Sequence, residues 1–149
     1  MSRSVSATIL LAASPQRVWE TVMDPSQLER WVTTHDSVAG GASGPLREGD
    51  AFTQRMRLAG KSFDVDWRVV EADEPHLARW EGEGPARSRA RVRYRLEAED
   101  GGTRFDYRNE FALPGGGLGK LAGGLLAAAP GKREASRSLE RLRTLLEDE

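Results

Sequence analysis

Three segments in the middle of the chain alternate between apolar and charged residues, with Asn109 the one exception, and this pattern constrains the fold more than any other feature. From 89 to 96 every odd position is an arginine, and the even positions are Ala90, Val92, Tyr94 and Leu96. The same period of two runs through 63–69 and 105–111. Because successive side chains of a strand point to opposite faces of a sheet, each segment is predicted to be a strand with one buried face. Sheets wetted on one face are typically antiparallel.

The N-terminal part of the chain predicts one further strand and two short helices. Val5 to Leu11 alternates in the same way and predicts a first strand. Ser14 followed by Pro15 is the favoured order for the N-cap and first residue of a helix, which Asp24-Pro25 then ends. A second short helix is predicted over 26–31, where Leu28 and Trp31 share one side.

Breaks rich in glycine, proline and aspartate divide the region from 33 to 111 into a meander of antiparallel strands. Among them, the residues 100–102 are typical of a tight hairpin between the last two strands. After Pro114 the pattern changes, and leucines recur at helical spacing from 118 to 125 and again from 139 to 146. We expect one long C-terminal helix that is kinked or interrupted near Pro130.

Length and composition favour one cytoplasmic domain. A chain of 149 residues has the usual size of a single domain, so we expect one domain over 1–149. The 22 Lys and Arg nearly balance the 23 Asp and Glu, which argues against nucleic acid as a partner. The sequence has no cysteine, consistent with a reducing compartment, and no apolar stretch long enough for stable membrane insertion. We expect a monomer or homodimer.

The order of these elements resembles a known superfamily. The segments that carry the resemblance are SATILLAASPQRVWETVMDPSQLERW, LREGDAFTQRMRLAG, RVVEADEPHLARWEGEG, GGTRFDYRNEFALPGG and SLERLRTLLE. They resemble the polyketide cyclase/dehydrase-type branch of the START-like superfamily, also called SRPBCC, over nearly the whole chain. The resemblance implies an α+β helix-grip, Bet v 1-like fold, in which a curved antiparallel sheet wraps around a long C-terminal helix. These motifs specify the fold and not a reaction.

The concave side of such a sheet is the predicted ligand site. A small apolar molecule is expected there because small residues at the start of the helix leave room, and the resemblance favours this interpretation. The alternative is that the same aromatic residues meet in a solid core. The candidate ligand-binding residues lie on the inner face of the strands, in the second short helix or in the C-terminal helix: Trp31, Phe52, Gln54, Met56, Phe63, Trp67, Trp80, Tyr94, Phe105, Tyr107, Asn109, Leu121 and Leu125.

Four of these residues are polar or carry a hydroxyl, namely Gln54, Tyr94, Tyr107 and Asn109. Each needs a hydrogen-bond partner when buried, and either a ligand oxygen or a neighbouring polar group could supply it. The segments 31–44 and 114–124 are expected to flank the entrance, because their glycines permit hinge-like changes; ordinary turns are the alternative.

Three functions agree with this pattern. The first is binding or carrying a small hydrophobic molecule such as a lipid, quinone or polyketide. The second is a polyketide cyclase or aromatase that positions a poly-ketone chain, with Tyr94, Tyr107 or an arginine near the mouth moving protons. The third, a protein-interaction module similar to the chaperone-activator branch, rests on the fold alone.

Other patterns indicate no catalytic, metal or cofactor site. His35 is followed by Asp36 and His76 lies near Glu74, but no HxxxH or HxH spacing exists, so no metal is predicted. The GGGLGKLAGG segment lacks the ending of a phosphate-binding loop, and no cofactor is expected. The arginines from 87 to 95 could bind phosphate or RNA, but their period predicts a charged outer face of the sheet near Asp64, Asp66 and Asp106.

Overall fold

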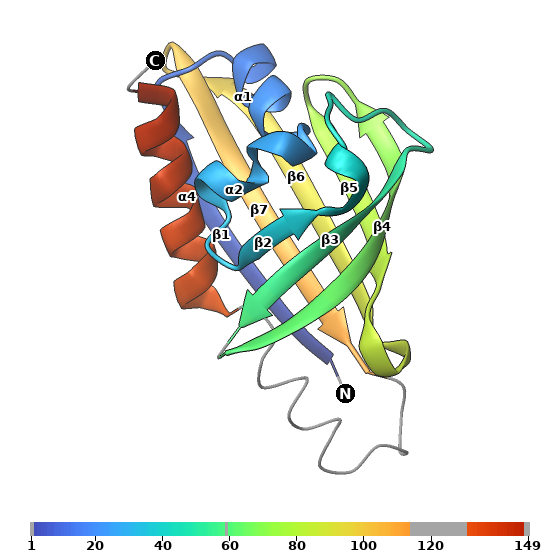
Figure 1. The fold of residues 1–149 in the computed structure, drawn as a ribbon. Coiled ribbons are helices and arrows are strands. Elements are labelled where there is room, and N and C mark those ends of the chain that lie inside the picture. The colour runs from blue at the N-terminus through green and yellow to red at the C-terminus, as the bar shows by residue number, and fades with distance from the viewer. Residues whose placement is uncertain (1, 59, 114–130, 148–149) are drawn as a thin grey trace.

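The computed structural model describes residues 2–58, 60–113 and 131–147, and Figure 1 shows a curled sheet with one long helix against it. The described strands form one antiparallel sheet in the order β1-β7-β6-β5-β4-β3-β2. Their bounds are β1 Ser2–Leu11, β2 His35–Val38, β3 Ala51–Leu58, β4 Lys61–Asp73, β5 Leu77–Glu83, β6 Arg89–Glu99 and β7 Gly102–Ala112. The helices are α1 Pro15–Val22, α2 Leu28–Trp31 and α4 Lys132–Glu147, with short 3₁₀ turns at Pro25–Gln27, Ala39–Gly41 and Pro85–Arg87. This is the predicted helix-grip fold.

The start of α1 confirms the capping prediction. The Ser14 hydroxyl accepts a hydrogen bond from the Arg17 amide at 3.2 Å, and Pro15 occupies the first turn. Val18, Trp19 and Val22 are then buried on one side of the helix. A serine cap satisfies one of the amides that a helix start leaves without a partner, which explains why the chain turns from strand to helix here.

The hairpin between β6 and β7 also follows the prediction. Glu99 pairs with Gly102, so Asp100 and Gly101 alone form the turn. Both have positive φ, 51° and 80°, as a two-residue turn that matches the twist of the strands requires. This turn sets the register of the two strands that carry Tyr94 and Tyr107, which lie directly opposite each other.

A bulge in β4 follows directly after the predicted alternation of 63–69. Val69 pairs with Trp80 and Glu71 pairs with Arg79, so Val70 is an extra residue without a partner on β5. A bulge of this kind shifts the two-residue period by one position. Glu71 therefore lies on the outer face instead of the inner one, and Val70 is 38% exposed.

The charged outer face is observed, but some of its partners differ from the prediction. We expected the arginines of β6 to lie near Asp64, Asp66 and Asp106. Asp106 of β7 is directly opposite Arg95 of β6, as expected. Asp64 and Asp66 lie on β4, and Arg89 and Arg91 instead reach Glu83 and Glu81 of β5, at 3.3 and 3.9 Å. The reason is the strand order, since β5 and β7, and not β4, flank β6.

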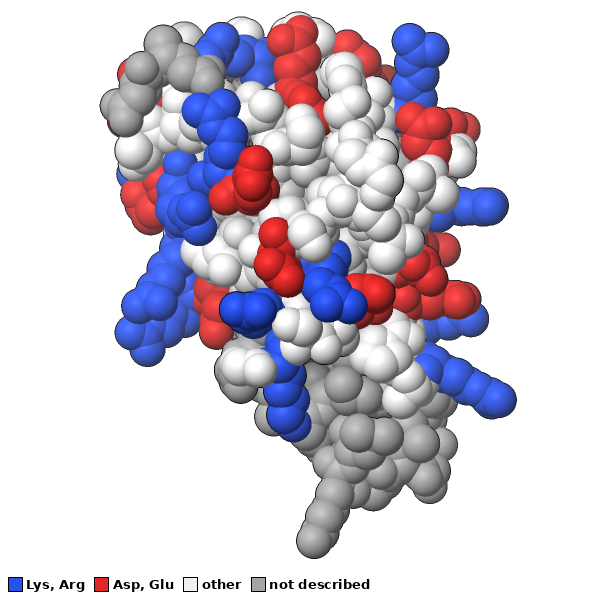
Figure 2. Space-filling view, in the orientation of Figure 1, with Lys and Arg blue, Asp and Glu red and all other residues white. Residues whose placement is uncertain are grey.

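Over the face seen in Figure 2, acidic and basic side chains are interspersed. Exposed ion pairs such as Arg89–Glu83 and Arg91–Glu81 each contribute little to stability.

Helix α4 packs mainly against β1 and α2. Its buried residues recur at helical spacing: Ala135, Ser138, Leu139, Leu142 and Leu146. Gly131 precedes the helix, and its amide donates to the Glu134 carboxylate at 3.1 Å, which caps the first turn. The predicted helix from 118 to 130 lies outside the described residues. Within the described part of the chain, no helix is long and apolar enough to cross a membrane.

Candidate functional site

A small cavity lies between the inner face of the sheet, α2 and the first turns of α4. Its volume is about 50 Å³. Four strands from β4 to β7, together with β3, supply one wall, and the two helices supply the other. The lining residues are Leu28, Trp31, Val32, Thr34, Gln54, Met56, Trp67, Trp80, Val92, Tyr94, Tyr107, Asn109, Glu134, Ala135, Ser138 and Leu139.

Several residues that the sequence singles out line this cavity together: Trp31, Gln54, Met56, Trp67, Trp80, Tyr94, Tyr107 and Asn109. Phe52 and Phe105 are buried behind them and do not line it. Phe63 is partly buried against the core, also away from the cavity. Leu121 and Leu125 lie outside the described residues, as does the predicted entrance segment 114–124. Of the other predicted entrance segment, 31–44, Trp31, Val32 and Thr34 line the wall.

The sequence reasoning missed the contribution of the first turns of α4. Glu134, Ala135 and Ser138 line the cavity. A signal for two of them was present, because Leu139, Leu142 and Leu146 define a helical face that continues back to Ala135 and Ser138. Ser138 also links the helix to the chain after α2, since its hydroxyl accepts a hydrogen bond from the Thr33 amide at 3.1 Å.

A chain of aromatic rings fills most of the concave face and explains why the cavity is small. The ring of Trp80 lies 5.4 Å from Phe52 and 5.3 Å from Tyr94, measured between centroids. Tyr94 continues the chain to Phe105 at 5.3 Å and to Tyr107 at 6.0 Å. Tilted and edge-on contacts at these distances are favourable. The concave face therefore combines an aromatic cluster with a cavity beside it.

Gly82 makes room for one of the indole rings. It lies opposite Trp67 in the register of β4 and β5. A Cβ atom at Gly82 would lie 2.7 Å from Trp67 Cε3 and 2.7 Å from Val65 Cγ1. Both distances are far below van der Waals contact, so any side chain at position 82 would displace Trp67 and Val65.

Two successive hydrogen bonds on the polar side of the cavity fix the protonation state of His35 Nδ1. The Trp67 indole N–H donates to Gln54 Oε1 at 2.8 Å, and Gln54 Nε2 lies 2.9 Å from His35 Nδ1. Since an indole only donates, the Gln54 oxygen is the acceptor and its amide nitrogen donates to His35. His35 Nδ1 is then unprotonated. Burial lowers the pKa of His35 below 6.5, against the opposing charges of Glu29 and Asp36, which agrees with a neutral ring.

The two tyrosines in the cavity wall are held in their neutral form. Burial raises the pKa of Tyr94 well above 10.0, and the neighbouring Tyr107 raises it further. Burial also raises the pKa of Tyr107 to about 12, although a hydrogen bond with Asn109 opposes the shift. Groups with such pKa values donate hydrogen bonds near neutral pH but are poorly matched to proton transfer.

Two further donors in the wall are buried without a partner. The indole N–H groups of Trp31 and Trp80 make no hydrogen bond with the described residues. A buried polar group without a partner costs free energy. Trp31 and Trp80 both line the cavity, and an acceptor oxygen is complementary to an indole N–H group. Among the described residues, no three His, Cys, Asp or Glu side chains are placed to hold a metal ion together.

Comparison with known proteins then identifies the family. Residues 2–147 match the family model described as polyketide cyclase / dehydrase and lipid transport. The chain belongs to this family. Over 143 residues it is 29% identical to an uncharacterized protein of Mycobacterium tuberculosis, a match that covers 95% of this chain and 97% of that protein.

Solved structures share the fold of this chain. Protein CV1439 from Chromobacterium violaceum superimposes with a TM-score of 0.71 at 18% identity, covering 97% of each chain. Ara h 8.0201 superimposes with a TM-score of 0.67 at 11% identity over the whole of both chains. These likenesses concern the fold alone.

Proposed function

We propose that the chain binds a small hydrophobic molecule between the sheet and α4, and that it carries or senses this molecule. The observation that carries the proposal is the cavity between the sheet and α4, whose wall is aromatic and aliphatic apart from a few polar groups. Sites of this kind bind through buried apolar area and use a few polar groups for orientation. The membership of a family described partly by lipid transport supports the same function.

The hydrogen-bond donors among the lining residues support a ligand that has an acceptor oxygen. Trp31 and Trp80 bury indole N–H groups that lack a partner, and the Tyr94 hydroxyl is neutral at physiological pH. A carbonyl, quinone or carboxyl-ester oxygen would accept from such groups, and the rest of the ligand would contact the rings. Within the hydrophobic class, we therefore propose an oxygenated molecule over a plain hydrocarbon.

The size of the cavity requires that side chains move when the ligand enters. A volume of about 50 Å³ accommodates a few water molecules, whereas drug-sized ligands occupy several hundred. Met56 has a flexible, unbranched side chain, and the side chains of Tyr107 and Asn109 are partly exposed. An empty cavity of this size costs only about 1 kcal/mol, so the protein remains folded without its ligand.

Filling the cavity from α4 tests this proposal. Ala135→Leu places a larger side chain in the cavity wall, and Ser136→Leu adds the same side chain at an exposed position of the same helix. We expect the uncharged fluorescent probe N-phenyl-1-naphthylamine to bind the wild type and Ser136→Leu alike, and Ala135→Leu about tenfold more weakly. Circular dichroism checks that each variant is folded. Equal binding by the folded Ala135→Leu variant would place the probe elsewhere and contradict the proposal.

Cyclase chemistry is the second candidate, and the two tyrosines favour it. Tyr94 and Tyr107 lie opposite each other in the wall and could hold two ketone oxygens of one chain. Their raised pKa values assign them to hydrogen bonding of the carbonyls, with rate enhancement by positioning. In a cyclisation assay with a short poly-ketone thioester, Tyr94→Phe and Tyr107→Phe should each reduce product formation. Product formation that does not depend on the protein would reject this second function.

A further inference from the structure

Three arginines lie side by side across the outer face of the sheet. In the strand register, Arg93 of β6 is directly opposite Arg79 of β5 and directly opposite Arg108 of β7. Residues opposite each other on antiparallel strands have Cβ atoms about 5 Å apart, and like charges at this spacing repel. This arrangement costs stability unless something negative lies over it.

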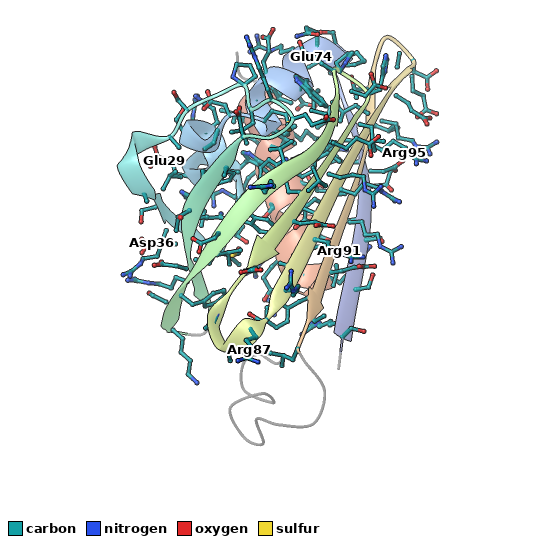
Figure 3. The ribbon with its side chains drawn as sticks, turned by 90° about the vertical axis from the view of Figure 1, so that its right-hand side faces the viewer. Glu29, Asp36, Glu74, Arg87, Arg91 and Arg95 are labelled. Carbon is teal, nitrogen blue, oxygen red and sulfur yellow. The ribbon has the colours of Figure 1, made fainter. Side chains whose placement is uncertain are left out.

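A groove of about 340 Å³ lies over this row. Five arginines and two glutamates line it, so its net charge is +3, although the whole chain carries -1. The charged lining residues are Arg79, Glu81, Arg91, Arg93, Arg95, Arg108 and Glu110. In Figure 3 the labelled Arg91 and Arg95 lie on the side of β6 that is turned away from α4. The groove is therefore separate from the cavity on the inner face.

The acids at the groove do not neutralise its centre. Glu110 pairs with Arg108 at 2.8 Å, and Glu71 pairs with Arg79 at 3.5 Å. Arg93 forms no ion pair with any described residue, and its Nε–H is buried without a hydrogen-bond partner. A buried guanidinium donor without an acceptor is rare and costly. The centre of the row thus has a guanidinium that no described carboxylate neutralises.

The bulge in β4 completes one wall of the groove. The bulge turns Glu71 to the outer face, and Val70, its extra residue, lines the groove together with Leu77. Bulges commonly redirect a side chain next to a binding site. The groove thereby places a short apolar wall beside the arginine row.

We propose that this groove binds the phosphate group of a small soluble molecule. The planar guanidinium donates two parallel hydrogen bonds to phosphate oxygens, and adjacent arginines can contact different oxygens of one phosphate or diphosphate. The apolar wall of Val70 and Leu77 contacts the adjoining part of the molecule. This inference is independent of the function proposed for the inner cavity.

The same observations disfavour a nucleic acid as the occupant. Single-stranded nucleic acids bind along extended basic grooves with aromatic rings on which bases stack. The aromatic residue among those lining the groove is Trp80, which is 2% exposed. Glu81 and Glu110 also place negative charge at the groove, where a continuing phosphate backbone would meet it.

An NMR titration of the arginine side chains tests the proposal. Inorganic pyrophosphate is added to the ¹⁵N-labelled full chain, and the Nε–Hε signals of Arg79, Arg93 and Arg108 are followed. We expect saturable shifts for these three signals, and binding about tenfold weaker in Arg93→Ala. Arg93→Lys, which keeps the charge but loses the planar guanidinium with its two parallel donors, should weaken binding as well. Arg57→Ala removes the same charge from the outer face of β3, away from the groove, and should bind as the wild type does.

Five results would overturn the proposal. Shifts that grow linearly without saturation, or equal affinity in Arg93→Ala and Arg57→Ala, would mean general charge screening only. Equal binding of acetate would show that the groove does not select phosphate. Displacement of pyrophosphate by a much lower concentration of a poly-uridine strand would identify a nucleic acid as the occupant of the groove. Binding to phosphatidylglycerol vesicles without a response to pyrophosphate would assign a lipid headgroup.

Discussion

Gln54 connects the aromatic cluster to the polar side of the cavity. Its amide oxygen accepts from Trp67 and its nitrogen lies beside His35, so one side chain orients an indole and fixes a histidine in the neutral form. The sequence pattern correctly placed Gln54 on the inner face, because it alternates with exposed residues of β3. It could not identify His35 as the partner, because that contact depends on how β2 pairs with β3.

Protonation of His35 should make stability depend on pH. The pKa of His35 is lowered by folding, so as the pH falls below 6.5 the unfolded chain takes up the proton first, and stability is lost down to the native pKa. We expect the free energy of unfolding in urea to decrease between about pH 7.5 and pH 5, and to decrease less in His35→Gln. His76→Gln, at the exposed second histidine, is the control. If only the His76 variant flattened the profile, the assignment would be wrong.

Gly82→Ala should destabilise the protein through contact with Trp67. The added Cβ would overlap the indole and Val65, which typically costs about 1–3 kcal/mol in a packed core. Urea unfolding measures the loss, and tryptophan fluorescence reports the movement of the ring. The smaller ring in Trp67→Phe should leave room for the Gly82→Ala methyl group. The double variant should therefore lose less free energy of unfolding than the sum of the two single losses. Simple additivity would show that the ring is not the obstacle.

At the scale of elements, local sequence patterns predicted the strands and the helix starts, but they did not predict irregular pairing between strands. The alternation in β6 and the Asp100-Gly101 turn are properties of neighbouring residues, and both were predicted correctly. The bulge at Val70 depends on the partner strand, so the sequence period alone would continue past Val69 and turn Glu71 inward. The same applies to the arginine row, which exists only because β5 and β7 flank β6.

The cap of α1 offers a test at this scale. Ser14→Ala removes the hydroxyl that accepts from the Arg17 amide, and should lower the free energy of unfolding by about 1 kcal/mol. Ser136→Ala is the matched control, because Ser136 is exposed within α4. Urea denaturation of both variants gives the comparison. A loss as large in Ser136→Ala as in Ser14→Ala would show that the cap is not the cause.

At the scale of the whole molecule, the resemblance to the START-like superfamily predicted the fold better than the ligand or the size of the cavity. One face of the curved sheet packs against α4, as expected. The size of the cavity, however, is set by how the rings of Trp80, Tyr94 and Phe105 pack. Ring packing is decided by contacts among residues far apart in the sequence, which periodicity does not specify. The family therefore indicates a hydrophobic ligand, and the structure limits how much space is preformed for it.

Native mass spectrometry of the protein purified without detergent tests the central claim most directly. We expect a complex with one oxygen-containing apolar molecule per chain, which organic extraction releases for identification, and we expect Ala135→Leu to lose this mass while Ser136→Leu keeps it. An apo mass for the wild type, together with no binding when lipids, quinones and polyketides are added back, would contradict the claim that the cavity between the sheet and α4 is a ligand site.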